Sequence, residues 1–230
     1  MFFVKTDGLK KSFGSVKAVD GVSLEVKPKE LFGVLGPNGS GKTTIIKCLT
    51  GQLKPDAGSV SIAELDVLKH PVKARELIGV IPEQETPPSF LTAEEYLYFV
   101  ARIRKLKDPA KAIDHWVEFL DFSDQRKVLC KDLSRGTRQK LMFAQAFLHG
   151  PKIAFIDEPL VNLDPIIQKR MKEFLKKYVK GGRSIFLSTH SLDIAKELCT
   201  RLCVLNKGRV VYTGKPARNM ERMFLKAVRK

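Results

Sequence analysis

The fold is decided by one stretch, Gly36-Pro37-Asn38-Gly39-Ser40-Gly41-Lys42-Thr43-Thr44, which fits the pattern G-x-x-x-x-G-K-[ST]. Loops of this pattern bind the phosphates of a nucleotide through their backbone N–H groups. Residues 31–35 before the loop form a short apolar run that is typical of a buried strand. After the loop, Ile45, Ile46 and Leu49 recur at helical spacing. The stretch therefore has the strand, loop and helix order that a phosphate-binding loop needs.

The residue types in this loop suit a nucleoside triphosphate and Mg²⁺. Its glycines let the backbone curl around the phosphates, and the helix N-terminus adds the positive end of its dipole. We expect Lys42 to supply a positive charge to the β- and γ-phosphates. We expect the Thr43 hydroxyl to ligate Mg²⁺.

Two carboxylates follow a second apolar run. Residues 153–156 are typical of a buried strand, and Asp157 and Glu158 come directly after it. Ligands of such proteins lie at the carboxyl ends of the sheet strands, so both carboxylates are expected beside the γ-phosphate. Asp157 would hold Mg²⁺ together with Thr43, and Glu158 would polarise the attacking water as general base.

The order of strand and helix patterns predicts an α/β fold with a mostly parallel sheet. We expect one domain over residues 1–230, because the chain is long enough and 43% hydrophobic, which suffices for a full core. Near the N-terminus, residues 2–6 and 22–26 alternate as exposed-edge strands do. A helical subdomain is expected at about residues 88–150, and Thr92-Ala93-Glu94-Glu95 is a capping box that would begin one of its helices.

Composition excludes several classes of protein. No apolar run approaches the length of a membrane helix, the N-terminus lacks the features of a signal peptide, and the four cysteines lack metal-ligand spacing. An intracellular location is therefore expected. The net charge of +16 is uneven, since residues 166–230 carry 17 basic and 4 acidic residues. This excess indicates either a solvated lysine-rich surface or a footprint for nucleic acid or an anionic membrane. No aromatic residues interleave with the charges as stacking on bases would need, which favours the solvated surface.

Further motifs give a family resemblance. Leu133-Ser134-Arg135-Gly136-Thr137 stands upstream of the strand that ends in Asp157, and Val161-Asn162-Leu163-Asp164 follows it. Over nearly its whole length the sequence resembles the ATP-binding subunit of an ABC transporter, closest to the exporter-like subgroup with separate ATPase and membrane subunits. By this resemblance the two stretches correspond to the LSGGQ signature and the D-loop. His190 corresponds to the switch histidine and Phe13 to the aromatic residue that stacks on the base.

The resemblance implies a P-loop NTPase core with an N-terminal antiparallel β subdomain and an inserted α-helical subdomain. It implies ATP and Mg²⁺ as cofactors, with Ser134 and Gly136 contacting ATP on a second subunit, so the working unit would be a homodimer or a pair with a paralogous ATPase subunit. His190 would bond the γ-phosphate. The expected catalytic residues are Glu158, His190 and Lys42. The expected nucleotide-binding residues are Phe13, Gly36, Pro37, Asn38, Gly39, Ser40, Gly41, Lys42, Thr43, Thr44, Ser134, Gly136 and Asp164, and the expected metal ligands are Thr43, Asp157, Glu83 and Gln84.

The sequence departs from the family pattern at three places. Arg135 and Thr137 replace Gly and Gln of the signature, while Ser134 and Gly136 remain. At the Q-loop, Glu83 stands at the usual glutamine position and Gln84 follows it, so both stay candidates for contact with Mg²⁺ or its water. Lys29 replaces a glycine in the turn before the loop strand, which predicts slight local strain.

The resemblance implies an ATPase that energises transport through a separate membrane permease, peripheral on the inner face of the cell membrane. The helical insert, from Thr92 to about Lys131, would present the docking surface. The alternative is a related ATPase that acts on nucleic acid or in translation. The single ATPase unit and the lack of a long coiled-coil insertion count against it, so nucleic acid is not an expected partner. The substrate and the direction of transport do not follow from the sequence.

Overall fold

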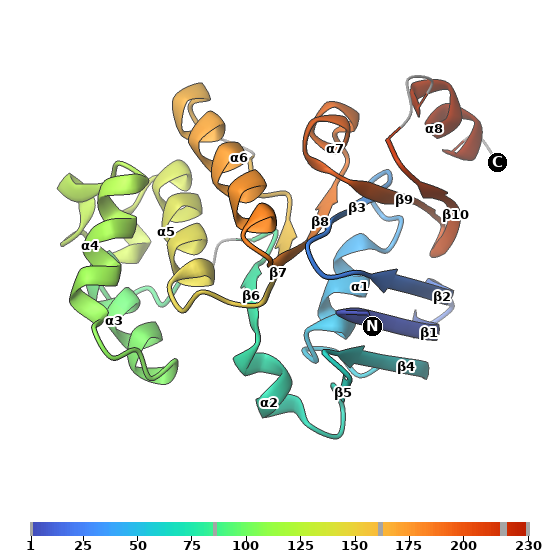
Figure 1. Ribbon diagram of the computed structural model, residues 1–230, viewed down its shortest axis with the longest axis horizontal. Helices are drawn as coiled ribbons and strands as arrows, with labels where there is room; N and C mark the ends of the chain where they lie inside the picture. Colours follow the sequence, from blue (N-terminus) through green and yellow to red (C-terminus); the bar gives the residue numbers. More distant parts are fainter. Residues whose placement is uncertain (1, 85–86, 161–162, 217–219, 229–230) are drawn as a thin grey trace.

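The structure, a computed structural model, describes residues 2–84, 87–160, 163–216 and 220–228 (Figure 1). Its strands are β1 (Val4–Phe13), β2 (Val16–Val26), β3 (Leu31–Leu35), β4 (Ala57–Ile62), β5 (Leu65–Asp66), β6 (Ile78–Ile81), β7 (Ile153–Asp157), β8 (Ser184–Thr189), β9 (Arg201–Asn206) and β10 (Arg209–Gly214). Its helices are α1 (Lys42–Leu49), α2 (Pro71–Glu76), α3 (Ala93–Ile103), α4 (Pro109–Phe119), α5 (Arg135–Phe147), α6 (Pro165–Lys180), α7 (Leu192–Leu198) and α8 (Met220–Val228), with 3-10 turns at Ser123–Gln125 and Cys130–Asp132.

Two sheets organise these elements. The larger sheet has the strand order β10-β9-β3-β8-β7-β6, and all its pairings are parallel except that of β9 with β10. The smaller sheet has the order β2-β1-β4-β5 and is antiparallel. The predicted fold class is therefore confirmed: a mostly parallel sheet, an antiparallel N-terminal sheet and a helical segment.

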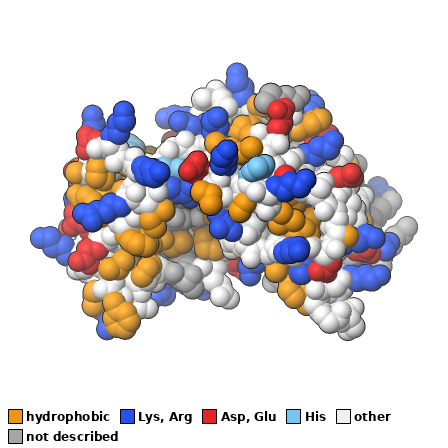
Figure 2. Space-filling model, turned by 90° about the horizontal axis from the view of Figure 1, so that it is seen from below, with side chains coloured by type: hydrophobic (Ala, Val, Ile, Leu, Met, Phe, Trp, Pro, Cys, Tyr) orange, Lys and Arg blue, Asp and Glu red, His pale blue; other side chains and the backbone are white. Residues whose placement is uncertain are grey.

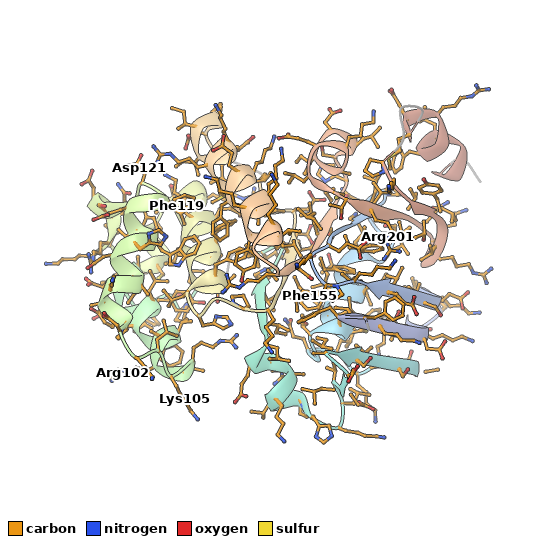
Figure 3. All side chains as sticks on the ribbon, in the orientation of Figure 1. Arg102, Lys105, Phe119, Asp121, Phe155 and Arg201 are labelled. Atoms are coloured by element: carbon orange, nitrogen blue, oxygen red, sulfur yellow. The ribbon has the colours of Figure 1, made fainter. Side chains whose placement is uncertain are left out.

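The core has two layers, one on each face of the parallel sheet. Between the sheets, α1 packs among apolar side chains of both, including Phe32, Phe155 and Phe186. Phe155 and Phe186 lie 5.6 Å apart between ring centroids, and Figure 3 shows Phe155 near the middle of the molecule. Strands β3, β7 and β8 are buried along their whole length, and β3 and the first four residues of β7 are accordingly continuous apolar runs rather than alternating ones.

The opposite face of the parallel sheet carries α5 and α6, and α3 and α4 pack beyond them (Figure 1). Trp116 of α4 joins three of these helices, because its ring lies 5.9 Å from that of Phe143 in α5 and 5.1 Å from that of Phe174 in α6. Contact between α5 and β6 is close. A Cβ on Gly79 would lie 2.2 Å from the carbonyl oxygen of Ala146, so only glycine fits there.

Local signals agree with the structure in part. Thr92 and Glu95 form the predicted capping box, and Ser134 caps α5 by accepting a hydrogen bond from the N–H of Thr137. Helix α2 was not predicted, because six residues are too few for a helical period to show. Lys29 has a φ of 60°, a left-handed conformation that favours glycine and accounts for the expected strain. Among the described helices, none has the length and apolar character needed to cross a membrane.

Candidate nucleotide site

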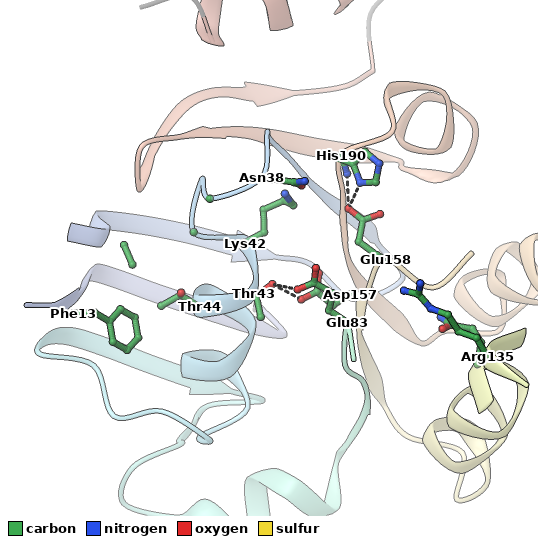
Figure 4. A pocket seen from close by; sticks show the side chains of 14 residues that line it. Phe13, Asn38, Lys42, Thr43, Thr44, Glu83, Arg135, Asp157, Glu158 and His190 are labelled. Atoms are coloured by element: carbon green, nitrogen blue, oxygen red, sulfur yellow. Dashed lines mark hydrogen bonds and ion pairs between the residues drawn. The ribbon is translucent and has the colours of Figure 1, made fainter. Parts of the chain in front are cut away.

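A cavity of about 420 Å³ opens where the phosphate loop meets the carboxyl ends of the parallel strands (Figure 4). Its walls come from parts of the chain that lie far apart in sequence. The lining residues are Phe13, Ala18, Asn38, Gly39, Gly41, Lys42, Thr43, Thr44, Glu83, Arg135, Gln139, Asp157, Glu158 and His190. Most of the residues that the sequence predicts to bind nucleotide or metal thus share one cavity.

The loop from Gly36 to Gly41 has the shape of a backbone cradle. A Cβ on Gly41, whose φ is +106°, would lie 2.1 Å from the carbonyl oxygen of Ala18. A Cβ on Gly36 would lie 2.5 Å from the carbonyl oxygen of Leu205, so neither position admits a side chain. A Cβ on Gly39 would have no other atom within 4 Å, so the space beside this residue is open. The loop therefore presents bare backbone to the cavity, as phosphate binding requires.

Lys42 is held at the loop by carbonyl groups. Its Nζ donates hydrogen bonds to the carbonyl oxygens of Gly36 at 2.9 Å and Pro37 at 3.1 Å. Burial lowers the pKa of Lys42, while the negative charges of Glu158, Asp157 and Glu83 act against this shift. A cation held this way can exchange its carbonyl partners for phosphate oxygens, which are stronger acceptors because they are charged.

Three oxygen-bearing side chains meet beside Lys42. The Thr43 hydroxyl donates to Asp157 Oδ2 at 2.7 Å and lies 3.2 Å from Glu83 Oε2. Ser188 donates its hydroxyl to the other oxygen of Asp157. Burial raises the pKa of Asp157, hydrogen bonds from Ser188 and Thr43 act against the rise, and the charges of Glu83 and Glu158 add to it.

This donor set fits Mg²⁺, which prefers hard oxygen ligands. No group of three or more His, Cys, Asp or Glu residues placed to hold a metal occurs among the described residues. In proteins Mg²⁺ is usually bound by one or two carboxylates and completes its coordination with water and phosphate oxygens.

Glu158 stands next to Asp157 in an unusual backbone conformation. Its φ of 49° lies in the left-handed region, which a non-glycine residue adopts only when its surroundings support it. Its Oε1 accepts hydrogen bonds from the backbone N–H and the ring Nδ1 of His190, both at 2.7 Å (Figure 4). Its Oε2 accepts from the Thr189 hydroxyl at 3.2 Å. Two of the three side chains with expected catalytic roles, Glu158 and His190, thus touch each other.

Comparison with known proteins agrees with the nucleotide site that this geometry indicates. The protein-family profile described as "ABC transporter" matches residues 19–161. The chain belongs to the ABC transporter family. A curated relative, the Nod factor export ATP-binding protein I of Burkholderia pseudomallei, is 36% identical over 210 residues, which is 90% of this chain and 69% of the relative. The expectation of an ATP-binding subunit that energises ABC transport is confirmed.

Solved structures of ABC proteins agree. The chain superposes on an ATP-binding subunit of an ABC transporter with a TM-score of 0.88 and 27% identity, covering 98% of this chain and 94% of that one. It also superposes on cbiO1 of Clostridium perfringens, described as part of the ABC transporter complex cbiONQ, with a TM-score of 0.80 and 25% identity, covering 97% and 92%.

The ABC subunit's two Q-loop candidates differ in position. Glu83 lines the cavity and contacts Thr43, whereas Gln84 is not among the lining residues. The geometry therefore favours Glu83. Phe13 lines the cavity at its outer side, with 52% of its surface exposed and Lys11 Nζ lying 5.8 Å from its ring centroid. An exposed ring at this place can stack on a nucleotide base.

Seven expected ligand residues of this ABC subunit lie outside the cavity lining, namely Gly36, Pro37, Ser40, Gln84, Ser134, Gly136 and Asp164. Ser134 and Gly136 are at the N-terminal end of α5, and the exposed Ser134 hydroxyl caps that helix. Asp164 caps α6 by accepting a hydrogen bond from the N–H of Ile167 at 2.9 Å. The D-loop residues Val161 and Asn162 lie outside the described residues.

Sequence reasoning missed two polar residues of the cavity. Arg135 was noted only as a departure from the signature, and Gln139 was not singled out, yet both line the cavity from α5. The available signal was their spacing of four residues, which places them on one face of the helix.

Proposed function

We propose that this ABC subunit hydrolyses ATP in a Mg²⁺-dependent reaction, with Glu158 as general base. The carrying observation is the shared cavity: Lys42 and Thr43 at one wall face Asp157 and Glu158 at the end of β7. Phosphoryl transfer to water needs a cation for the phosphates, ligands for Mg²⁺ and a base for the water. Lys42, the Thr43 hydroxyl with Asp157, and Glu158 match these three needs.

Each residue has a separate task in this proposal. The loop backbone and Lys42 bind the phosphates, and Phe13 stacks on the base. Thr43, Asp157 and Glu83 would hold Mg²⁺, which supplies positive charge to the phosphate oxygens when bound. Glu158 accepts the proton of the attacking water, and His190 bonds the γ-phosphate and orients the Glu158 carboxylate.

The proposed working unit is a dimer. Ser134 and Gly136 lie at the N-terminus of α5, where backbone N–H groups and a hydroxyl can bind a phosphate, but outside their own chain's cavity. They are therefore available to ATP bound on a second subunit, either another copy or a paralogue. ATP would close the dimer because it contacts both chains, and hydrolysis would remove those contacts.

A docking surface for the membrane permease is proposed on the side of α2 and α3. Val72 and Ile103, with 68% and 61% of their surface exposed, line a cavity of about 790 Å³ together with Arg104 and Leu106. Figure 2, which views the molecule from below, shows hydrophobic side chains gathered in its left half, the side on which the helical segment lies in Figure 1. Figure 3 places Arg102 and Lys105 at the end of α3, pointing outward. An apolar surface beside exposed cations fits a cytoplasmic loop of a permease, with the subunit peripheral on the inner membrane face.

Export is the proposed direction of transport. The support is the relative's name, which describes an export ATP-binding protein.

Phosphate release from ATP by the purified chain tests the hydrolysis. We expect release that requires Mg²⁺ and is lost with EDTA, and absence of release would overturn the proposal. For docking, tagged Ile103→Glu and the control Val211→Glu are compared in pull-downs of the partner permease. Val211 is also exposed, but it lies on β10. Only Ile103→Glu should reduce recovery of the permease, and equal recovery with both variants would contradict this surface.

A further inference from the structure

Polar side chains of α5 join this helix to the core at two places. Gln145 Nε2 donates to the carbonyl oxygen of Val80 in β6 at 2.6 Å. Gln139 Nε2 donates to the carbonyl oxygen of Pro159 at 3.0 Å. The first contact lies on a sheet strand, whereas the second lies at the residue that directly follows Glu158.

The Gln139 contact is the more enclosed of the two. Only 3% of the Gln139 surface is exposed, and its hydrogen bond to Pro159 is buried. Leaving a buried carbonyl oxygen without a donor is unfavourable, because the oxygen has lost its contact with water. The hydrogen bond from Gln139 therefore holds the Pro159 peptide group in a fixed position relative to α5.

The backbone at this point needs support. Glu158 has a φ of 49°, and its N–H donates to the carbonyl oxygen of Ser188 at 3.1 Å. The Ser188 contact therefore holds Glu158 from the N-terminal side. On its C-terminal side, the Gln139 side chain holds the next carbonyl. The two hydrogen bonds together keep a strained conformation that aims the Glu158 side chain into the cavity.

We propose that Gln139 is a positioning residue for ATP hydrolysis, which holds the general base Glu158 through the Pro159 carbonyl. This inference rests on the proposed function. It also links the ATP sites of the two proposed subunits, because Gln139 lies on α5, which has Ser134 as its N-cap and Gly136 in its first turn. From Ser134 to Gln139 is about 7.5 Å along a helix, so a shift of the helix N-terminus on the partner's ATP moves the Gln139 donor with it.

Gln139→Met tests this role, because methionine has a similar shape and no donor. We expect kcat to fall by about tenfold to a hundredfold, since small misplacements of a catalytic group cost this much. The ATP Kd should stay within about threefold, because the Gln139 amide donates to the Pro159 carbonyl rather than to a proposed phosphate ligand. Gln145→Met is the matched control: it removes another glutamine donor of the same helix, and kcat should stay within about twofold.

Gln139→Glu supplies a readout that a purely structural role would not move. When ionised, this carboxylate can only accept hydrogen bonds and repels the Pro159 carbonyl, but when protonated it can donate. Burial raises the pKa of such a carboxyl, so its kcat relative to wild type should rise as the pH falls from about 8 to about 6.

The outcomes separate this inference from the proposed function. Wild-type protein that releases no phosphate from ATP would overturn the proposed function itself. Wild-type hydrolysis with an unchanged kcat in Gln139→Met, or an equal loss in Gln145→Met, would overturn only the role of Gln139. Should Gln139→Met fail to fold, a Gln139→Glu activity ratio that does not change with pH would overturn it.

Discussion

Glu158 and His190 are joined by two hydrogen bonds of 2.7 Å, because one carboxylate oxygen accepts from both the backbone N–H and the ring Nδ1 of the histidine. A carboxylate oxygen can only accept, so Nδ1 carries a proton. The Glu158 side chain is only 12% exposed, and its carboxylate is thereby held toward the end of β8. In the proposed hydrolysis this carboxylate must also reach the attacking water, so the contact with His190 sets the starting position of the proposed general base.

Replacement of Glu158 by glutamine keeps the shape of this side chain and removes its basicity. We expect Glu158→Gln to bind ATP with unchanged affinity and to lose at least about a hundredfold in turnover. The ATP-bound dimer should then accumulate, which gel filtration with and without ATP measures. A variant that stays monomeric with ATP would remove the main support for the two-subunit site.

Lys42 should determine nucleotide affinity itself. Its Nζ lies among the loop carbonyls, so Lys42→Ala removes the positive charge at the phosphates. We expect the ATP Kd to rise at least about tenfold, the effect of losing a charged hydrogen bond. Lys47→Ala is the control, because Lys47 lies on the same helix and is exposed. Equal affinity of both variants in calorimetry would contradict the phosphate-loop assignment.

Most of the fold could be predicted because its signals are local. The phosphate loop needs glycine at Gly36 and Gly41, where a Cβ would collide with backbone atoms, and this need appears directly in the sequence. Asp157 and Glu158 could be found because they end a continuous apolar run, which only a strand buried on both faces produces.

The remaining features depend on contacts distant in sequence. Gln139 reaches the Pro159 carbonyl 20 residues away, and nothing in its neighbourhood predicts that partner. The preference for Glu83 over Gln84 depends on which side chain faces Thr43, 40 residues earlier in the chain. The first pairing joins α5 to the segment after β7, and the second joins α1 to the segment after β6, so only the folded structure shows them.

The buried Asp157 carboxylate should lower the free energy of unfolding of the nucleotide-free protein. Burial raises its pKa in the folded state above the ordinary value of 3.8. Below pH 3.8 the Asp157 carboxyl is protonated in both the folded and the unfolded protein. At higher pH the folded protein must hold an unfavourable buried charge that the unfolded protein exposes to water. We therefore expect Asp157→Asn to raise the Tm of the nucleotide-free protein at neutral pH, with the gain vanishing near pH 4, while activity is lost. Thermal melts at both pH values measure this, and a lower Tm at neutral pH would contradict it.

His149 should make stability depend on pH in the opposite direction. Burial, and then the charge of Arg104, lowers the pKa of His149 to about 4, although its ring Nε2 bonds the Ile78 carbonyl at 3.1 Å. As the pH falls below 6.5, the His149 ring becomes protonated in the unfolded protein, whereas in the folded protein it stays neutral down to about pH 4. The free energy of unfolding should therefore fall through this range.

Urea titrations of His149→Gln measure that contribution. Glutamine can donate to the same carbonyl and does not titrate, so the decrease in stability between about pH 6.5 and pH 4 should be smaller than in wild type. His115→Gln is the control, since His115 is exposed on α4. An identical pH dependence in wild type and His149→Gln would show that His149 is not the group responsible.

Gly79 should tolerate no side chain, because β6 and α5 touch there. A Cβ at this position would lie 2.2 Å from the Ala146 carbonyl oxygen and 2.9 Å from Pro151, so α5 must move away from the sheet. We expect Gly79→Ala to cost about 1–3 kcal/mol, as overpacking does. For a chain of this size that lowers the Tm by roughly 2–4 °C per kcal/mol. Gly181→Ala is the control, since its nearest atom would be 3.3 Å away and its φ is −70°. Equal Tm values for the two variants would show that α5 can shift without cost, and with it the Gln139 donor.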